Sequence, residues 1–192
     1  SICGGDNYRG FVNFGDSKKV YLDDWCSGGG YELSNDRNIP LEGFSLQVVS
    51  NASYTIGESS NLEFDPRCYN ILYTGSGEIL YKSFNNGYSS FPLYDFGENV
   101  TSIEVAWSNP DIIYVATYDS YWGDKNIWRT DDGGVTFVNI TPTFPGIQED
   151  NWIPYDITIS DNDPLNVWIA RCPNSTSYDS YESSKVYNST NG

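Results

Sequence analysis

The fold is indicated by the stretch RTDDGGVTF, which occupies residues 129–137. Its two adjacent glycines allow a backbone with positive φ, and the Asp before them can accept hydrogen bonds from N–H groups of the same turn. Phe137 comes three residues after the second glycine, where its ring can pack between neighbouring sheets. The stretch therefore predicts a tight turn between two antiparallel strands, called a box turn below.

Three other segments align with this turn. Measured between their first residues, Ser34, Ser83, Thr130 and Ser189, the spacings are 49, 47 and 59 residues. The alignment assigns structural box positions to Ser34 and Asp36; to Ser83, Asn85 and Gly87; to Thr130, Asp132, Gly134 and Phe137; and to Ser189 and Asn191. A repeat of this length is typical of propellers and other repeat architectures. We expect these residues to stabilise turns, with Phe44, Phe91 and Phe137 buried between sheets.

A second marker repeats in the same phase. About twenty residues before each box turn lies a turn dipeptide, and an apolar run follows it; the dipeptides are Gly15-Asp16, Asp65-Pro66, Asn109-Pro110 and Asp163-Pro164. The two markers together predict four strands per repeat. In the third repeat the expected strands span residues 101–107, 112–117, 126–130 and 136–140.

The predicted fold class is therefore all-β, a β-propeller of four-stranded antiparallel blades joined by box turns. One domain covers residues 1–192, with about four blades at 8–50, 60–96, 101–140 and 155–192. The last blade stops inside its box turn, so we expect an incomplete propeller that continues into further blades or domains of the same polypeptide.

Composition limits the classes of function. The net charge of −16 repels phosphate backbones and anionic lipids, so neither nucleic-acid binding nor membrane insertion is expected. The carboxylates serve solubility or hold Ca²⁺; both readings stay open, and no residue is assigned to a metal or cofactor. The chain contains no His, which removes Ser-His-Asp triads and imidazole zinc sites.

The segments 34–36, 129–137 and 188–192 resemble the Asp-box (BNR) repeats of sialidases, xyloglucanase-type glycoside hydrolases, sortilin-type receptors and photosystem assembly factors. The segment SNPDIIYVAT at 108–117 is most similar to the repeats of large secreted propeller proteins of bacteria. The resemblance implies a secreted or cell-surface protein whose binding face lies opposite the box turns. It supplies no catalytic residue, because no xyloglucanase-type aspartate is identifiable. A sialidase is disfavoured because the arginines lie mostly at boxes and turns.

Candidate ligand-binding residues lie in loops on the face opposite the box turns. The segment YDSY occurs at 118–121 and again at 178–181. The candidates are Tyr118, Asp119, Tyr121, Trp122, Trp152, Tyr178, Asp179 and Tyr181. Rings that stack on sugars beside carboxylates that accept hydroxyl hydrogen bonds suit a glycan site. Two alternatives remain: the rings pack the loops onto the sheets, or Asp119 and Asp179 form an acid–base pair.

These observations predict a non-catalytic propeller module of a secreted or cell-surface protein, which binds glycan or protein ligands in adhesion or scaffolding. The alternative is a xyloglucanase-like glycoside hydrolase that acts on a polysaccharide. An intracellular assembly factor is the third reading. We also expect at most one disulfide, between Cys3 and Cys26.

Overall fold

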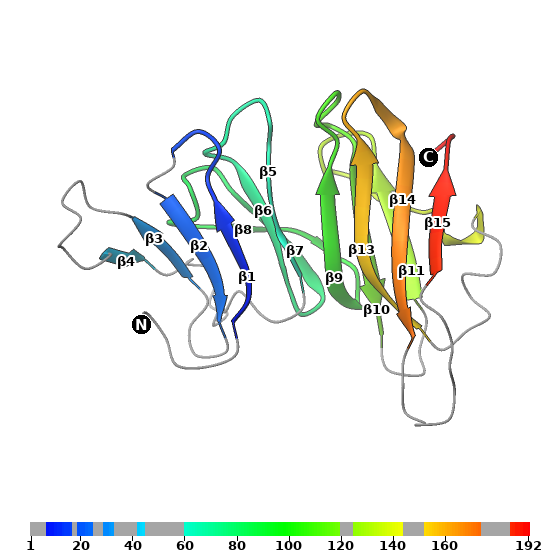
Figure 1. The fold of residues 1–192 in the computed structure, drawn as a ribbon, viewed down its shortest axis with the longest axis horizontal. Coiled ribbons are helices and arrows are strands. Elements are labelled where there is room, and N and C mark those ends of the chain that lie inside the picture. The colour runs from blue at the N-terminus through cyan, green and yellow to red at the C-terminus, as the bar shows by residue number, and fades with distance from the viewer. Residues whose placement is uncertain are drawn as a thin grey trace.

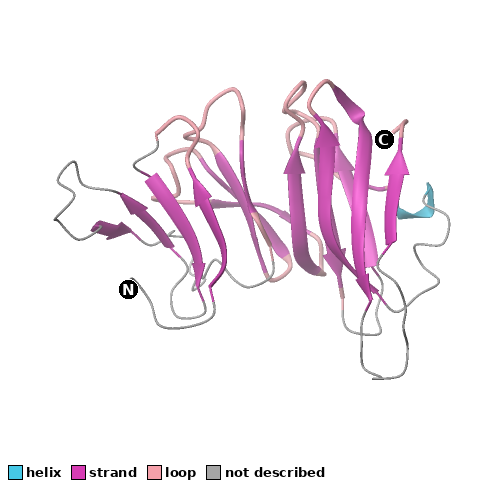
Figure 2. Cartoon of the chain, viewed as in Figure 1, coloured by secondary structure: helices cyan, strands magenta, loops and turns pink. Residues whose placement is uncertain are grey.

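A computed structural model describes residues 7–16, 19–24, 29–32, 42–44, 60–119, 125–143, 152–173 and 185–192. These residues form antiparallel sheets that stand side by side in chain order (Figures 1 and 2). The described chain contains no α-helix, and η1 (Thr141–Thr143) is a single 3-10 turn. Among the described residues no helix is long and apolar enough to cross a membrane. The predicted fold class, an all-β propeller, is confirmed.

Each sheet consists of strands that are consecutive in sequence. The first contains β1 (Asn7–Val12), β2 (Lys19–Asp24), β3 (Gly29–Glu32) and β4 (Glu42–Phe44). The second contains β5 (Leu62–Phe64), β6 (Leu72–Ser76), β7 (Ile79–Ser83) and β8 (Phe91–Asp95). The third contains β9 (Asn99–Val105), β10 (Ile113–Tyr118), β11 (Lys125–Thr130) and β12 (Val138–Asn139). The fourth, as described, contains β13 (Trp152–Ser160), β14 (Asp163–Pro173) and β15 (Lys185–Ser189).

The outer strands of the third sheet differ from those expected. β9 ends at Val105, because the N–H of Ala106 donates to the carbonyl of Ile112 (3.0 Å) and closes the turn to β10. The last strand shrinks to Val138–Asn139. The N–H of Thr136 is taken by the Asp132 carboxylate, so this residue belongs to the turn and not to the strand ladder.

Apolar side chains fill the three seams between consecutive sheets. Across the first seam Tyr21 packs with Leu62, Phe64 and Leu72. Across the second, Tyr73 and Leu80 pack with Ile103, Val105, Ile113 and Val115. Across the third, Tyr114, Ala116 and Ile127 pack with Ile157, Ile159, Val167 and Ile169. A tyrosine from the second strand of a sheet thus meets an apolar face of the next sheet at every seam. This burial is the main favourable contribution to the arrangement.

Polar side chains on or directly before the first strands also join neighbouring sheets. Asn61 accepts from the N–H of Ile103 (2.7 Å) and donates to its carbonyl (2.6 Å). One sheet later Ser102, at the same register, accepts from the N–H of Ile157 (3.2 Å). Because these backbone groups are buried, their pairing fixes how far each sheet is displaced along its neighbour.

The expected burial of Phe91 is wrong. Its side chain is 45% exposed, whereas Phe137 is only 9% exposed. The second box turn has one more residue before its Phe, so the buried Ser90 takes the position of Phe137. A shift of one residue moves a side chain to the other face of a strand. The side chain of Phe44 lies outside the described set.

Cys68 is a free, exposed cysteine. Cys3 and Cys26, the pair expected to form a disulfide, lie outside the described residues. That expectation stays a prediction.

The two phenylalanines provide a matched test of the seam. The ring of Phe137 lies 4.8 Å from that of Tyr94 and 5.0 Å from that of Phe96, measured between centroids. Phe137→Ala should lower the free energy of unfolding by about 3 kcal/mol, the usual loss for a buried Phe. Phe91→Ala should cost less than about 1 kcal/mol, because surface substitutions have small effects. Urea denaturation followed by tryptophan fluorescence measures both; equal losses would show that Phe137 does not hold the seam.

Candidate functional site

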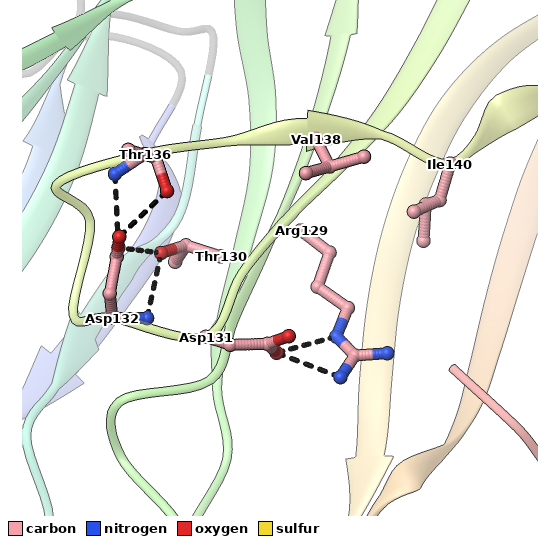
Figure 3. A pocket seen from close by; sticks show the side chains of 7 residues that line it. All are labelled: Arg129, Thr130, Asp131, Asp132, Thr136, Val138 and Ile140. Atoms are coloured by element: carbon pink, nitrogen blue, oxygen red, sulfur yellow. Dashed lines mark hydrogen bonds and ion pairs between the residues drawn. The ribbon is translucent and has the colours of Figure 1, made fainter.

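The third box turn is built around one carboxylate (Figure 3). Thr130 donates through Oγ1 to Oδ1 of Asp132 (2.6 Å), and the same hydroxyl accepts from the N–H of Gly134 (3.1 Å). Oδ1 of Asp132 also accepts from the N–H groups of Val135 (2.9 Å) and Thr136 (3.0 Å). The Thr136 hydroxyl donates to Oδ2 (2.6 Å). These bonds, first those from the hydroxyls of Thr130 and Thr136, hold the pKa of Asp132 well below its usual value. The carboxylate thus faces the turn backbone.

The second and fourth box turns repeat this hydrogen bonding with amides. Ser83 donates to Oδ1 of Asn85 (3.0 Å), and that oxygen accepts from the N–H of Ser89 (2.9 Å). Ser189 donates in the same way to Oδ1 of Asn191 (2.9 Å). The hydroxyl of Ser83 accepts from the N–H of Gly87 (2.8 Å). The fit of Asn to this position follows from its carbonyl oxygen, which accepts as a carboxylate oxygen does. Ser34 and Asp36 lie outside the described residues.

In each box turn that the structure describes, the fourth position binds the preceding A–B turn, the connection between the first two strands of the same sheet. Asn86, Gly133 and Gly192 have φ of 60°, 73° and 80°. Their N–H groups donate to the carbonyls of Asn70 (2.8 Å), Asp111 (2.9 Å) and Leu165 (2.9 Å) respectively. In these three turns the residue that donates this N–H has a left-handed backbone, a conformation that Gly or Asn tolerates best.

Cations on the box-turn rim are held by local partners. Arg67 forms ion pairs of 2.7 Å with both Asp65 and Asp111. Arg129 pairs with Asp131 at 2.7 Å and lies over the ring of Tyr114, 5.9 Å from its centroid. These two arginines serve separate turns and do not converge on a common anion.

A hollow of about 280 Å³ lies beside the third box turn. Its lining consists of Arg129, Thr130, Asp131, Asp132, Thr136, Val138 and Ile140 (Figure 3). None of these residues was predicted to bind a ligand, and sequence patterns alone do not signal the hollow. Its walls combine the bonded carboxylates of the turn with two aliphatic side chains.

The opposite rim carries the predicted ligand residues that the structure describes. Tyr118 ends β10 and is half-buried, and Asp119 follows it with an exposed side chain. The carbonyl of Asp119 accepts a long bond from Nδ2 of Asn99 (3.4 Å). Trp152 opens β13, and its side chain is not described. The other candidates, Tyr121, Trp122, Tyr178, Asp179 and Tyr181, lie outside the described residues.

A cluster of hydrogen-bonded side chains that was not predicted from the sequence lies beside this rim and holds its strand ends together. Glu98 accepts from the hydroxyl of Thr117 (2.5 Å) and from Nδ2 of Asn126 (2.6 Å). Nε1 of Trp128 donates to the same threonine hydroxyl (3.0 Å). Glu98 therefore joins the turn before β9 to the end of β10 and the start of β11, and its carboxylate has a structural role. Tyr118 is the residue directly after Thr117, whose hydroxyl is held by these bonds.

Glu104 is a second carboxylate that sequence reasoning missed. Burial between the third and fourth sheets raises its pKa to about 7. A hydrogen bond from the N–H of Ile159 opposes this rise, and the charges of Asp156 and Asp161 add to it. Glu104 is the penultimate residue of β9 and lies toward the box-turn end of that strand, away from the predicted ligand rim. We assign it to the seam.

Within the described part of the chain, no group of three or more His, Cys, Asp or Glu side chains is placed to hold a metal ion.

Comparison with known proteins identifies the fold. No protein-family profile matches the chain, and no curated protein matches its sequence. Among solved structures, an ancestral GH74 enzyme superposes with a TM-score of 0.71 at 16% identity, covering 98% of this chain and 23% of the enzyme. The GH74 enzyme of Niastella koreensis gives a TM-score of 0.64 at 20% identity, over 95% of this chain and 28% of that chain. A luciferin-regenerating enzyme gives 0.55 at 11% identity, over 96% and 61%. The chain spans about a quarter of the length of the GH74 enzymes, and the likeness shows a β-propeller-type fold.

The carboxylate of the third box turn can be tested by two substitutions. Asp132→Ala removes the acceptor of two backbone N–H groups and should lower the melting temperature. Asp132→Asn keeps an acceptor, as Asn85 does in the second turn, and should lower it less. Because the folded-state pKa of Asp132 is depressed, its contribution is present above the unfolded pKa near 4 and is lost as pH falls toward the folded pKa. Thermal melts from pH 7 to pH 2 should show weaker acid sensitivity in both variants; unchanged acid sensitivity would contradict the assignment.

Glu104 should give the opposite pH dependence. Its folded-state pKa is raised above the ordinary value of 4.5, so ionisation opposes folding and stability falls as pH rises through about 7. Glu104→Gln should stabilise the protein at pH 8 by about 1–3 kcal/mol and have a much smaller effect at pH 5. Urea denaturation at both pH values measures this, with Glu78→Gln, in the exposed turn between β6 and β7, as the control. A gain of the same size at both pH values would refute it.

Proposed function

We propose that the chain is a non-catalytic β-propeller module of a secreted or cell-surface protein and that it binds a glycan or protein ligand on the rim opposite its box turns. A glycan is the ligand that the described residues favour. Membership of the Asp-box family is part of the same proposal, supported by the shared hydrogen bonding of three box turns.

The observation that carries the proposal is the pair Tyr118–Asp119. The tyrosine ends a strand that is buried along its length, so its backbone is held on a rigid support. The aspartate beside it exposes its carboxylate to solvent. An aromatic face next to an exposed acceptor matches the alternating C–H and hydroxyl surfaces of a sugar. Such a pair binds without needing a general acid.

Four carboxylates near the two rims are engaged in structural bonds, which favours binding over catalysis. Glu98 is satisfied by two donors, and Asp132 by hydroxyls and backbone N–H groups. Asp65 and Asp111 are paired with Arg67. These groups hold turns and strands, whereas a glycosidase needs two carboxyl groups that face one scissile bond.

The second candidate is a xyloglucanase-like glycoside hydrolase. It is favoured by the likeness to two GH74 enzymes, which carries information about the fold and not about the site. Under this reading Asp119 is one of a pair of catalytic carboxyl groups, and the chain contributes part of a larger active site.

Affinity electrophoresis in gels that contain xyloglucan or other plant and microbial polysaccharides separates the two candidates. Retardation should occur in at least one gel, and Tyr118→Ala should weaken it at least about fivefold, the effect of about 1 kcal/mol from a lost stacking ring. Asp119→Asn should weaken it less, since an amide still accepts hydrogen bonds. Tyr88→Ala, an exposed tyrosine on the box-turn rim, is the matched control and should leave retardation unchanged.

Reducing-end release is measured on the same polysaccharides. Release that is abolished by Asp119→Asn would establish the hydrolase and contradict a non-catalytic module. If Tyr118→Ala and Tyr88→Ala weaken retardation equally, the binding site does not lie on the rim that carries Tyr118. The absence of retardation in every gel would contradict the proposal that the ligand is a glycan.

A further inference from the structure

The hydroxyl of Tyr73 is a buried polar group without a protein partner. The Tyr73 side chain is completely buried in the second seam, and its Oη forms no hydrogen bond with any residue that the structure describes. Among these residues no other buried side-chain nitrogen or oxygen atom lacks a partner. Because an unpaired buried hydroxyl costs free energy, folded proteins almost always supply a partner for it. Its position in the fold indicates what that partner is.

The equivalent tyrosines of the two flanking seams bind the sheet that follows them. Tyr21 donates through Oη to the carbonyl of Asn86 (3.1 Å), and Tyr114 donates to the carbonyl of Pro164 (3.1 Å). Both carbonyls belong to turns on the box-turn rim of the next sheet. The hydroxyl of Tyr73, on the second strand of the second sheet, therefore points to the box-turn rim of the third sheet, and no such carbonyl receives it there.

An ion-paired network lies at this end of the second seam. Arg67, in the A–B turn of the second sheet, is 2.7 Å from Asp65 in the same turn and 2.7 Å from Asp111 in the A–B turn of the third sheet. Its guanidinium therefore spans the seam. Burial raises the pKa of Tyr73, and the charges of Asp65 and Asp111 raise it further while Arg67 opposes them. The network is thus within electrostatic range of the hydroxyl.

Lys82 completes the surroundings of the tyrosine. It pairs with Tyr73 across the two strands, and its Nζ lies 4.9 Å from the centroid of that ring. In the third sheet Arg129 lies over the equivalent tyrosine in the same way, but it also pairs with Asp131 of the box turn. The second box turn has Phe84 at that position, so it offers Lys82 no such carboxylate. The end of the second seam therefore holds two cations and two carboxylates.

This balance of charge selects a neutral ligand. The two carboxylates repel an anion, and the ammonium and guanidinium groups repel a cation. A partner must accept from a hydroxyl and donate to a carboxylate, and water does both. Asp65 has the capacity to receive it: its side chain is 1% exposed, and its Oδ2 accepts one bond, from Arg67 (2.7 Å), where a carboxylate oxygen can accept about two.

We propose that the box-turn end of the second seam is a binding site for one buried water molecule, which accepts a hydrogen bond from the hydroxyl of Tyr73 and donates one to Oδ2 of Asp65. The water does at this seam what the carbonyls of Asn86 and Pro164 do at the other two. It links the buried core of the second sheet to the turn whose arginine reaches the third sheet. The proposal is independent of the ligand on the opposite rim.

Replacing single hydroxyls tests the site, because Tyr→Phe keeps the buried ring. Tyr73→Phe should lower the melting temperature by roughly 2–4 °C, as expected for one hydrogen bond in a chain of this length. Tyr114→Phe, which loses the bond to Pro164, is the matched control and should lower it by a similar amount. A Tyr73→Phe chain that melts at or above the temperature of the unsubstituted chain would overturn the proposal, since removing an unpaired hydroxyl stabilises a protein.

A double-mutant cycle tests the second partner of the water. Oδ1 of Asp65 accepts from the backbone N–H of Arg67 (3.0 Å), so Asp65→Asn keeps its oxygen there and places an NH₂ group, which cannot accept, at the position of Oδ2. In the Asp65→Asn chain, Tyr73→Phe should lower the melting temperature by less than half of its effect in the unsubstituted chain. Tyr114→Phe should have the same effect in both chains. Equal effects of Tyr73→Phe in both chains would refute the link to Asp65.

A high-resolution crystal structure from crystals soaked in sodium bromide observes the site directly. It should show a water within hydrogen-bond distance of Tyr73 Oη and Asp65 Oδ2, and Tyr73→Phe should remove or displace it. An anomalous bromide peak at this place would overturn the proposal in favour of an anion site. A direct hydrogen bond from Tyr73 Oη to a protein group, with no water between them, would overturn it as well.

Discussion

One interaction recurs in the three box turns that the structure describes: a Ser or Thr hydroxyl donates to an Asp or Asn oxygen, and in the second and third turns that oxygen also accepts backbone N–H groups. In the third turn Thr130 and Asp132 provide it. The turn then has few backbone groups left without partners, although it projects from the sheet into solvent. Its fixed shape allows a fourth-position N–H, such as that of Gly133, to bind the A–B turn. The box turn is thus the joint that orients the third and last strands of a sheet relative to the first two.

The seams depend on this joint. With the turn fixed, Phe137 is aimed at the preceding sheet, and the second-strand tyrosine of that sheet meets an aliphatic face. Asn61 and Ser102 accept hydrogen bonds from backbone N–H groups of the next sheet, and these bonds fix the displacement along the strands. Apolar burial supplies most of the free energy, and the polar bonds select one packing among several with similar burial. The raised pKa of Glu104 is a cost of that arrangement.

Much of the fold could be predicted because the relevant interactions are local. Turn chemistry within a few residues identified the third box turn and the repeat, and alternation gave the strands. The burial of Phe91 could not be predicted in the same way, since one extra residue moves it to the exposed face and places Ser90 in the core. Glu98 and Glu104 were missed because their roles depend on contacts with other strands and sheets, which spacing in the sequence does not reveal. The residues that line the hollow beside Val138 lie in the third box turn and its flanking residues, and their motif predicts a turn but does not signal a hollow.

The two rims have different tasks in this account. The box-turn rim carries the cations and carboxylates that hold the sheets, and the opposite rim carries Tyr118 and Asp119 on a rigid strand end. Under the proposed function, stability and recognition lie on opposite rims, so that loops on the second rim can vary without loss of the fold.

Native-state amide hydrogen exchange, measured by NMR on the Thr130→Val and unsubstituted chains, tests the central claim most directly. The account predicts that the N–H groups of Gly134, Val135 and Thr136 exchange slowly in the unsubstituted chain, although the side chains of Val135 and Thr136 are exposed. It predicts that Thr130→Val, which keeps the shape and removes the hydroxyl, speeds exchange at all three and at Gly133. Fast exchange of these groups in the unsubstituted chain, or unchanged exchange in Thr130→Val, would contradict the claim that this hydrogen bonding fixes the joint.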